Sequence, residues 1–297
     1  MFWVWFHLFV ICMLLLDLKG FHRNEKAITW QSAGLCSLFW ILLALSFNLF
    51  VLFSLGKEAS LIFFTAYLLE TSLSVDNLFV FLSIFSFFQI EPRYQHKVLF
   101  FGVLGAFICR VFFILVGISV LEMAHWVYAI FGIILCSSAF FLYRQKEDRS
   151  LRDTWLMKLC MKYLRVDKDA SQSRFFVKKN GKIYVTTLFV ALVLVEASDI
   201  LFAIDSIPAV LSLTSDLFLA YTSNVFAVLG LRSMYFLLVS FQKKFVFLKS
   251  AIIMMLFFIG GKMLLMPFWS FSSLFTLGGI VLILFSSFIA FKFKKNN

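Results

Sequence analysis

The sequence predicts an all-α fold, a polytopic transmembrane helix bundle of about nine spans, and three observations lead to it. Of the 297 residues, 62% are apolar and 14% are charged, whereas a soluble domain has about 45–50% apolar and about 25% charged residues. The apolar residues form runs near the length of about 20 residues that crosses a bilayer. Proline occurs only 3 times. This composition excludes a soluble enzyme, a disordered chain and a disulfide-rich secreted module.

We expect one integral membrane domain, residues 1–297, that contains a single long polar connector, the basic loop 143–182. The first apolar run is short, but Asp17-Leu-Lys-Gly20 is no cleavage site for a signal peptide, so we expect a retained span. Within the connector, Lys178-Lys-Asn-Gly181 predicts a turn. The predicted spans are 1–16, 30–54, 59–88, 97–120, 125–142, 184–211, 217–240, 247–266 and 269–291.

Basic residues predict the orientation of these spans. The connectors that follow odd-numbered spans, together with the C-terminal tail, hold 23 of the 27 Lys and Arg residues. By the positive-inside rule, the N-terminus faces outward and the C-terminus faces the cytoplasm. The net charge of +11 therefore reflects orientation and not nucleic-acid binding. We expect loop 143–182 to lie near anionic lipid, with a cytoplasmic partner as the alternative.

Acidic residues inside two spans are the main functional signal, because ionisable groups at membrane depth are costly and mark functional sites. Five of the sixteen acids lie in spans three and six. In each span an acid is followed, after five residues, by Asp and a small polar residue. The two copies are Glu70-x5-Asp76-Asn77 and Asp199-x5-Asp205-Ser206.

The repeated motif predicts an inverted-topology repeat. Spans three and six run in opposite directions and each opens a group of three, so spans 3–5 would mirror spans 6–8. Transporters built in this way bind their substrates near the bilayer midplane, between the repeats. Arg110 and Arg232 fall in the second span of each group and add to the likeness.

Helix geometry limits how the acids can meet. Six residues turn an α-helix by about 600°, so Glu70 and Asp76 cannot share one face, whereas Glu196 and Asp199 can. Either each helix is central, with polar neighbours on both sides, or it is unwound between its acids. Pro208 favours an irregularity in span six, because it leaves the Ile204 carbonyl without its usual donor.

The chemistry of these groups suits a hard divalent cation. Carboxylate, amide, hydroxyl and carbonyl oxygens are ligands for Mg²⁺, Ca²⁺ or Mn²⁺, and the four histidines and five cysteines lie elsewhere. The alternative is structural: Arg110 and Arg232 would pair with acids to hold the helices together. Lys262 is either an ion-pair partner or a cation that occupies the empty site.

The two motifs resemble the signatures of the TerC family, named for tellurium resistance and related to LysE-like exporters. Further segments are similar nearly from end to end. One segment departs, because this chain has Ala139-Phe-Phe-Leu142 where the family has a Gly-x-Lys-Met-like sequence. The similar segments are Leu69–Phe81, Glu196–Val210, Asp17–Arg23, Tyr94–Phe100, Asn224–Arg232 and Gly261–Leu264.

The resemblance implies export of a metal ion, most often Mn²⁺, across a bacterial-type cytoplasmic (inner) membrane, with no permanently bound cofactor. It implies a metal site formed by Glu70, Asp76, Asn77, Glu196, Asp199 and Asp205. Possible supporting residues are Ser72, Ser206, Asn224, Arg110, Arg232 and Lys262.

Three other functions are alternatives to metal export. An exporter of an organic solute would use Arg110 or Arg232 to bind a substrate carboxylate. A membrane scaffold for a stress, tellurite-resistance or secretion complex would use loop 143–182 for docking. An intramembrane aspartyl protease needs a Gly-x-Gly-Asp sequence, which neither Asp76 nor Asp205 has, so we expect no enzyme.

Overall fold

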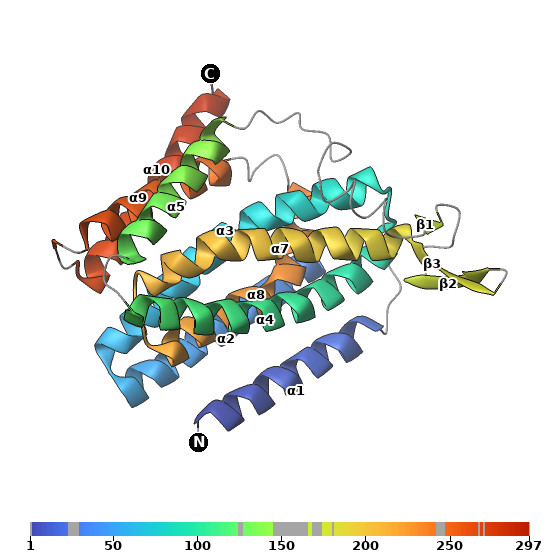
Figure 1. The fold of residues 1–297 in the computed structure, drawn as a ribbon, viewed down its shortest axis with the longest axis horizontal. Helices are drawn as coiled ribbons and strands as arrows, with labels where there is room; N and C mark the ends of the chain where they lie inside the picture. Colours follow the sequence, from blue (N-terminus) through green and yellow to red (C-terminus); the bar gives the residue numbers. More distant parts are fainter. Residues whose placement is uncertain are drawn as a thin grey trace.

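The computed structural model describes residues 2–22, 30–123, 127–144, 166–167, 174–179, 181–241, 247–266, 268–269 and 271–296. In these ranges it contains nine α-helices and one small sheet (Figure 1). The helices are α1 (Phe2–His22), α2 (Trp30–Leu55), α3 (Lys57–Phe87), α4 (Pro92–Met123), α5 (Val127–Arg144), α7 (Thr187–Leu211), α8 (Leu217–Phe241), α9 (Phe247–Leu265) and α10 (Ser273–Asn296).

The predicted all-α membrane bundle is confirmed. Each of the nine predicted spans coincides with one described helix, and seven of these helices are long and apolar enough to cross a membrane. In α1 and α9 the apolar stretches are shorter, Trp3–Met13 and Ser250–Leu265. Large apolar side chains such as Leu35 and Phe53 are exposed on the outer helices, as expected for a protein surrounded by lipid.

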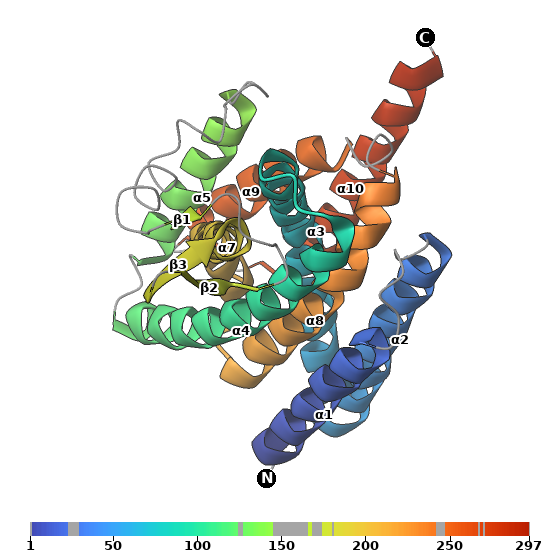
Figure 2. The ribbon, with the colours of Figure 1, turned by 90° about the vertical axis from the view of Figure 1, so that its right-hand side faces the viewer.

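Helix α7 lies inside the bundle, and Figure 2 shows it nearly end-on. It packs against α3, α4 and α5, while α8 packs against α2, α3 and α4. Most of α8 is buried, whereas most of α2 is exposed. Helices α3 and α7, which carry the acidic motifs, therefore have neighbours on several sides.

Both acidic helices are continuous. Helix α3 runs unbroken from Lys57 to Phe87, and α7 runs from Thr187 to Leu211 with Pro208 inside its last turn. Neither helix is unwound between its acids, so the structure favours the first resolution, a central helix with polar neighbours on more than one side. The irregularity expected from Pro208 does not interrupt α7.

A short sheet precedes α7. Its strands are β1 (Val166–Asp167), β2 (Phe176–Lys179) and β3 (Lys182–Thr186), in the order β1-β3-β2. The predicted turn is confirmed, because β2 ends at Lys179 and Gly181 has a φ of 75° before β3 begins. The sixth span starts later than predicted, at Thr187, since residues 184–186 belong to β3. The rest of loop 143–182 falls mostly outside the described residues.

Two glycines bring α5 and α9 into close contact. A Cβ atom on Gly132 would lie 2.8 Å from the Gly260 carbonyl oxygen, and one on Gly260 would lie 2.7 Å from Cys136 Sγ. Small residues at such crossings allow membrane helices to approach backbone to backbone. This crossing fixes α5, which in turn contacts α7.

Candidate functional site

A buried polar cluster lies where α3, α4, α7 and α8 meet. Each of its side chains is at most about 3% exposed, in a region otherwise built from aliphatic and aromatic residues. A polar group in such surroundings is costly unless it is hydrogen-bonded. The members are Glu70 and Asn77 from α3, Arg110 from α4, Asp199 from α7 and Asn224 from α8.

Arg110 is at the centre of this cluster. Its Nη1 atom donates a hydrogen bond to Glu70 Oε1 and a second one, of 3.1 Å, to Asn224 Oδ1. Its Nη2 atom lies 3.5 Å from Asp199 Oδ1. The same Asp199 oxygen accepts a 3.3 Å hydrogen bond from Asn77 Nδ2. One guanidinium thus connects both copies of the acidic motif.

Acceptors and donors of the cluster are both left without partners: among the described residues, Arg110 Nε and Asn224 Nδ2 donate no hydrogen bond. Glu70 Oε2 and Asp199 Oδ2 have no hydrogen-bond partner among the described residues, although both are buried. With both carboxylates ionised, the single charge of Arg110 leaves the cluster with a net charge of −1. Unsatisfied carboxylate oxygens are what a site for a divalent cation requires. Removing one member of a buried ion pair costs about 3–5 kcal/mol, so the cluster also holds the helices together.

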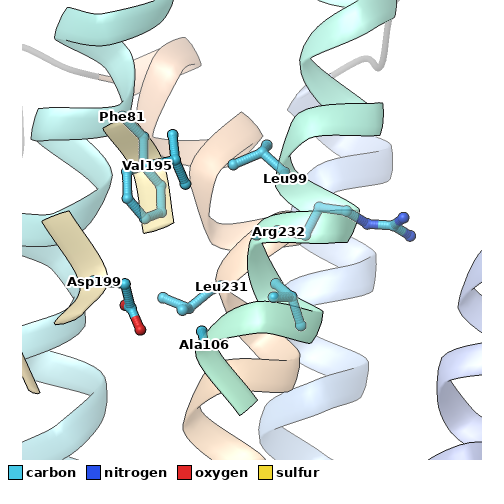
Figure 3. Close-up of a pocket in the computed structure, with 9 residues that line it drawn as sticks. Phe81, Leu99, Ala106, Val195, Asp199, Leu231 and Arg232 are labelled. Atoms are coloured by element: carbon cyan, nitrogen blue, oxygen red, sulfur yellow. The ribbon is translucent and has the colours of Figure 1, made fainter. Parts of the chain in front are cut away.

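A cavity of about 10 Å³ adjoins Asp199, room for about one water molecule. Phe81, Leu99, Val195 and Leu231 line it, so the approach to Asp199 from this side is mainly apolar and narrow (Figure 3). Arg232 also lines the cavity, but its guanidinium points away from Asp199. The likeness of Arg110 and Arg232 in the sequence therefore does not extend to their positions relative to this carboxylate.

Glu196 lies one turn before Asp199 on α7, but it faces α4. A Cβ atom added to Gly105 would overlap its carboxylate, so the absence of a side chain at Gly105 makes room for it. Glu196 is half-buried, and no hydrogen bond or ion pair to a described residue holds it. It therefore borders the cluster without joining it.

Asp205 faces a different neighbour. Its Oδ1 atom accepts a 2.6 Å hydrogen bond from Ser138 of α5, as expected because six residues along α7 separate it from Asp199 by about 240°. Ser206 is buried beside it, and its Oγ atom has no partner among the described residues. A second polar position thus lies between α7 and α5.

Ser72 and Asp76, both on α3, complete the predicted residues of this helix. The Ser72 hydroxyl donates a 2.7 Å hydrogen bond to the Leu68 carbonyl of its own helix, so this bond does not connect it to the cluster. Asp76 belongs to α3, but its side chain lies outside the described part of the structure.

Lys262 caps a helix. Its ammonium group is buried and donates a 3.0 Å hydrogen bond to the carbonyl of Ser212, the residue that ends α7. A cation at a helix C-terminus is stabilised by the free carbonyls and the helix dipole. Of the two expected roles, ion-pair partner or occupant of the acidic site, the described residues show neither.

We therefore expect Lys262→Met to lower stability without changing metal affinity. The variant loses a charge-assisted hydrogen bond, worth about 1.5–3 kcal/mol, and regains part of this by removing a buried charge. Thermal unfolding in detergent and Mn²⁺ titration would measure the two quantities, with exposed Lys57→Met as the control. A loss of Mn²⁺ affinity in Lys262→Met alone would place Lys262 at the metal site.

The predicted six-residue site is thus assembled only in part. Glu70, Asn77 and Asp199 come together, whereas Glu196 borders the cluster against α4 and Asp205 faces α5. Within the described ranges no three Asp, Glu, His or Cys side chains are close enough to hold one ion. Neither Ser138 nor Gly105 was singled out from the sequence. The only indication in the sequence was a polar residue, Ser138, and a small residue, Gly105, within apolar spans.

Comparison with known proteins assigns the family. The model of the integral membrane protein TerC family matches residues 55–297. The chain belongs to the TerC family. The match begins at the end of α2 and includes every residue of the polar cluster, so α1 and most of α2 precede it.

Relatives of similar length carry little functional information. An uncharacterized membrane protein of Myxococcus xanthus is 44% identical over 268 residues, which cover 90% of this chain and 84% of that protein. An uncharacterized membrane protein of Rickettsia bellii is 34% identical, covering 99% of this chain and 98% of that one. A protein of Escherichia coli named "Putative membrane-bound redox modulator Alx" is 39% identical, covering 97% and 92%. No solved structure matches the chain.

Proposed function

We propose that this TerC protein is a secondary transporter that exports a divalent cation, Mn²⁺ or a similar ion, by alternating access around α3 and α7. The observation that carries the proposal is the polar cluster at the meeting of four helices. Its two buried carboxylates come from the two copies of one motif, and each retains an oxygen with no partner among the described residues. A purely structural ion pair would need only one acid for Arg110.

The packing of the helices supports an inverted repeat of α3–α5 and α7–α9. In such a repeat α3 corresponds to α7, α4 to α8 and α5 to α9. The contact between α3 and α8 then corresponds to the contact between α7 and α4, and the structure has both. The contact of α3 with α9 likewise becomes that of α7 with α5, and both exist. Such a relation would let the two groups rock about the cluster, which lies between them.

We propose that this exporter lies in a bacterial-type cytoplasmic membrane, as the family resemblance implies, with its N-terminus outside, as the distribution of Lys and Arg indicates. The small apolar cavity next to Asp199 then lies on the cytoplasmic side of the cluster, since α4 and α7 begin there. Cations entering from the cytoplasm would require that side to open. Carboxylates freed of metal can take up protons, so proton exchange is the coupling that we propose.

An organic solute exporter fits the cluster less well. Such a transporter needs a cationic group to bind the substrate carboxylate, and Arg110 is already engaged by Glu70, Asp199 and Asn224. One relative is named for redox modulation, but the cysteines of the described residues give no support for a redox function of this chain. Cys12, Cys36, Cys109 and Cys136 form no disulfide among the described residues and lie on four different helices.

The proposal is tested by metal uptake into everted membrane vesicles, with Mn²⁺, Ca²⁺, Mg²⁺ and Zn²⁺ compared with and without a proton gradient. We expect uptake of Mn²⁺ that depends on the gradient and that is lost in Asp76→Asn and Asp205→Asn. In cells lacking their own exporter, the same variants should fail to give Mn²⁺ resistance at normal protein levels. Uptake no greater than in empty vesicles, or full resistance from both variants, would contradict metal export.

A further inference from the structure

We propose that Arg110 is a tethered competitor of the transported cation: it occupies the acidic site when no metal is bound, and metal and Arg110 exclude each other there. This inference rests on the proposed function, because it concerns how the same site fills and empties. It assigns Arg110 a role in releasing the ion, beyond that of joining helices.

The contacts of Arg110 are those that an incoming cation would need. Its guanidinium reaches an acidic residue of each repeat, Glu70 and Asp199, and the amide oxygen of Asn224. Two of these three are predicted metal ligands and the third is a predicted supporting residue. An ion that used both oxygens of each carboxylate would therefore displace Arg110 from the two oxygens that it now contacts.

Charge and space make the two occupants exclusive. With Arg110 in place the two carboxylates keep a net charge of −1, and a divalent ion in its place would bring the sum to zero. Both together would leave +1 in a site with little solvent, where like charges repel strongly. The adjoining cavity of about 10 Å³ cannot receive a guanidinium as well as an ion.

The cluster also offers Arg110 a partner when it moves. Nη1 donates to Glu70 and Asn224 together, so Arg110 can release the carboxylate and keep the Asn224 oxygen. Glu70 Oε2 and Asp199 Oδ2, the oxygens without partners among the described residues, would receive the ion first. Return of Arg110 to the carboxylates would then expel the ion, which is the step that an exporter must complete.

The test is Mn²⁺ binding to the purified full-length protein and to Arg110→Gln, measured by titration and by the rise of the unfolding temperature with added MnCl2. In the wild type Arg110 occupies the site nearly all the time, which lowers the apparent affinity for Mn²⁺. Arg110→Gln lacks this competitor and should bind Mn²⁺ about 10- to 100-fold more tightly. Its unfolding temperature should be lower without metal and should rise more on adding Mn²⁺, since a bound ligand stabilises the folded state. Uptake into vesicles should nevertheless fall.

Two further variants separate this role from loss of any buried cation. Arg110→Lys keeps the charge and should bind Mn²⁺ nearly as weakly as the wild type. Arg232→Gln also removes a buried guanidinium, but one that points away from Asp199, so Mn²⁺ should raise its unfolding temperature no more than that of the wild type. If Arg110→Gln binds Mn²⁺ no more tightly than the wild type, or does not fold even with Mn²⁺, the inference is wrong. If the wild type and Arg110→Gln both bind no divalent ion, the proposed function itself fails.

Discussion

Asp199→Asn should abolish Mn²⁺ uptake while leaving the protein folded. Asparagine has the same shape as aspartate and keeps an oxygen that can accept the hydrogen bond from Asn77. Arg110 retains its contacts with Glu70 and Asn224. The substitution removes mainly the negative charge and one oxygen that has no partner among the described residues. Because even outer-shell changes weaken metal sites about 10- to 100-fold, we expect affinity to fall by at least about 100-fold.

The matched control is Asp216→Asn. Asp216 is exposed, and its carboxylate caps the start of α8 by accepting hydrogen bonds from the amides of Phe218 and Leu219. Asparagine caps helices about as well as aspartate, so this variant should transport normally. Vesicle uptake, normalised to the amount of folded protein, measures both. Uptake by Asp199→Asn equal to that of Asp216→Asn would show that the charge of Asp199 is not used in transport.

Gly260→Ala should weaken the bundle and disturb the position of Asp205. The added methyl group would lie 2.7 Å from Cys136 Sγ and 3.0 Å from the Gly132 carbonyl oxygen. A backbone atom cannot move aside as a side-chain end can, so α5 and α9 must separate. Overpacking of this kind costs about 1–3 kcal/mol. Since α5 carries Ser138, its hydrogen bond to Asp205 should also weaken.

The next residue provides the control for this prediction. A Cβ atom on Gly261 would meet nothing within 4 Å, so Gly261→Ala has space for its methyl group. Replacing glycine inside a helix by alanine should stabilise it by about 0.5–1 kcal/mol. Thermal unfolding of both variants in the same detergent tests the pair. Equal unfolding temperatures would mean that the α5–α9 crossing is not as tight as described.

Local features of the sequence were sufficient to predict the spans. The length and hydropathy of each apolar run are properties of consecutive residues, and all nine predicted spans became helices. The turn at Gly181 was predictable for the same reason. The sheet was not predicted, because its strands are short and β1 pairs with β3 across residues distant in the sequence.

The site was predicted in composition but not in arrangement. The repeated motif identified Glu70, Asn77 and Asp199 as related, and they do meet. Spacing could not show that Asp205 turns to Ser138, because the partner lies 67 residues away. Spacing also could not show that Lys262 binds the C-terminus of α7 instead of entering the acidic site. Its partner, the Ser212 carbonyl, is a backbone group, and no sequence pattern marks a backbone group as a hydrogen-bond acceptor for a distant side chain.

The sequence by itself determined that this is a membrane protein with acids where the bilayer penalises charge, because burial in lipid is dictated by apolar length. Only the tertiary structure decided which basic residue forms ion pairs with those acids. Arg110 and Arg232 occupy similar places in the sequence, yet only the packing of α4 beside α3 and α7 brings Arg110 between Glu70 and Asp199. The choice depends on contacts between helices far apart in the chain, and no local pattern encodes it.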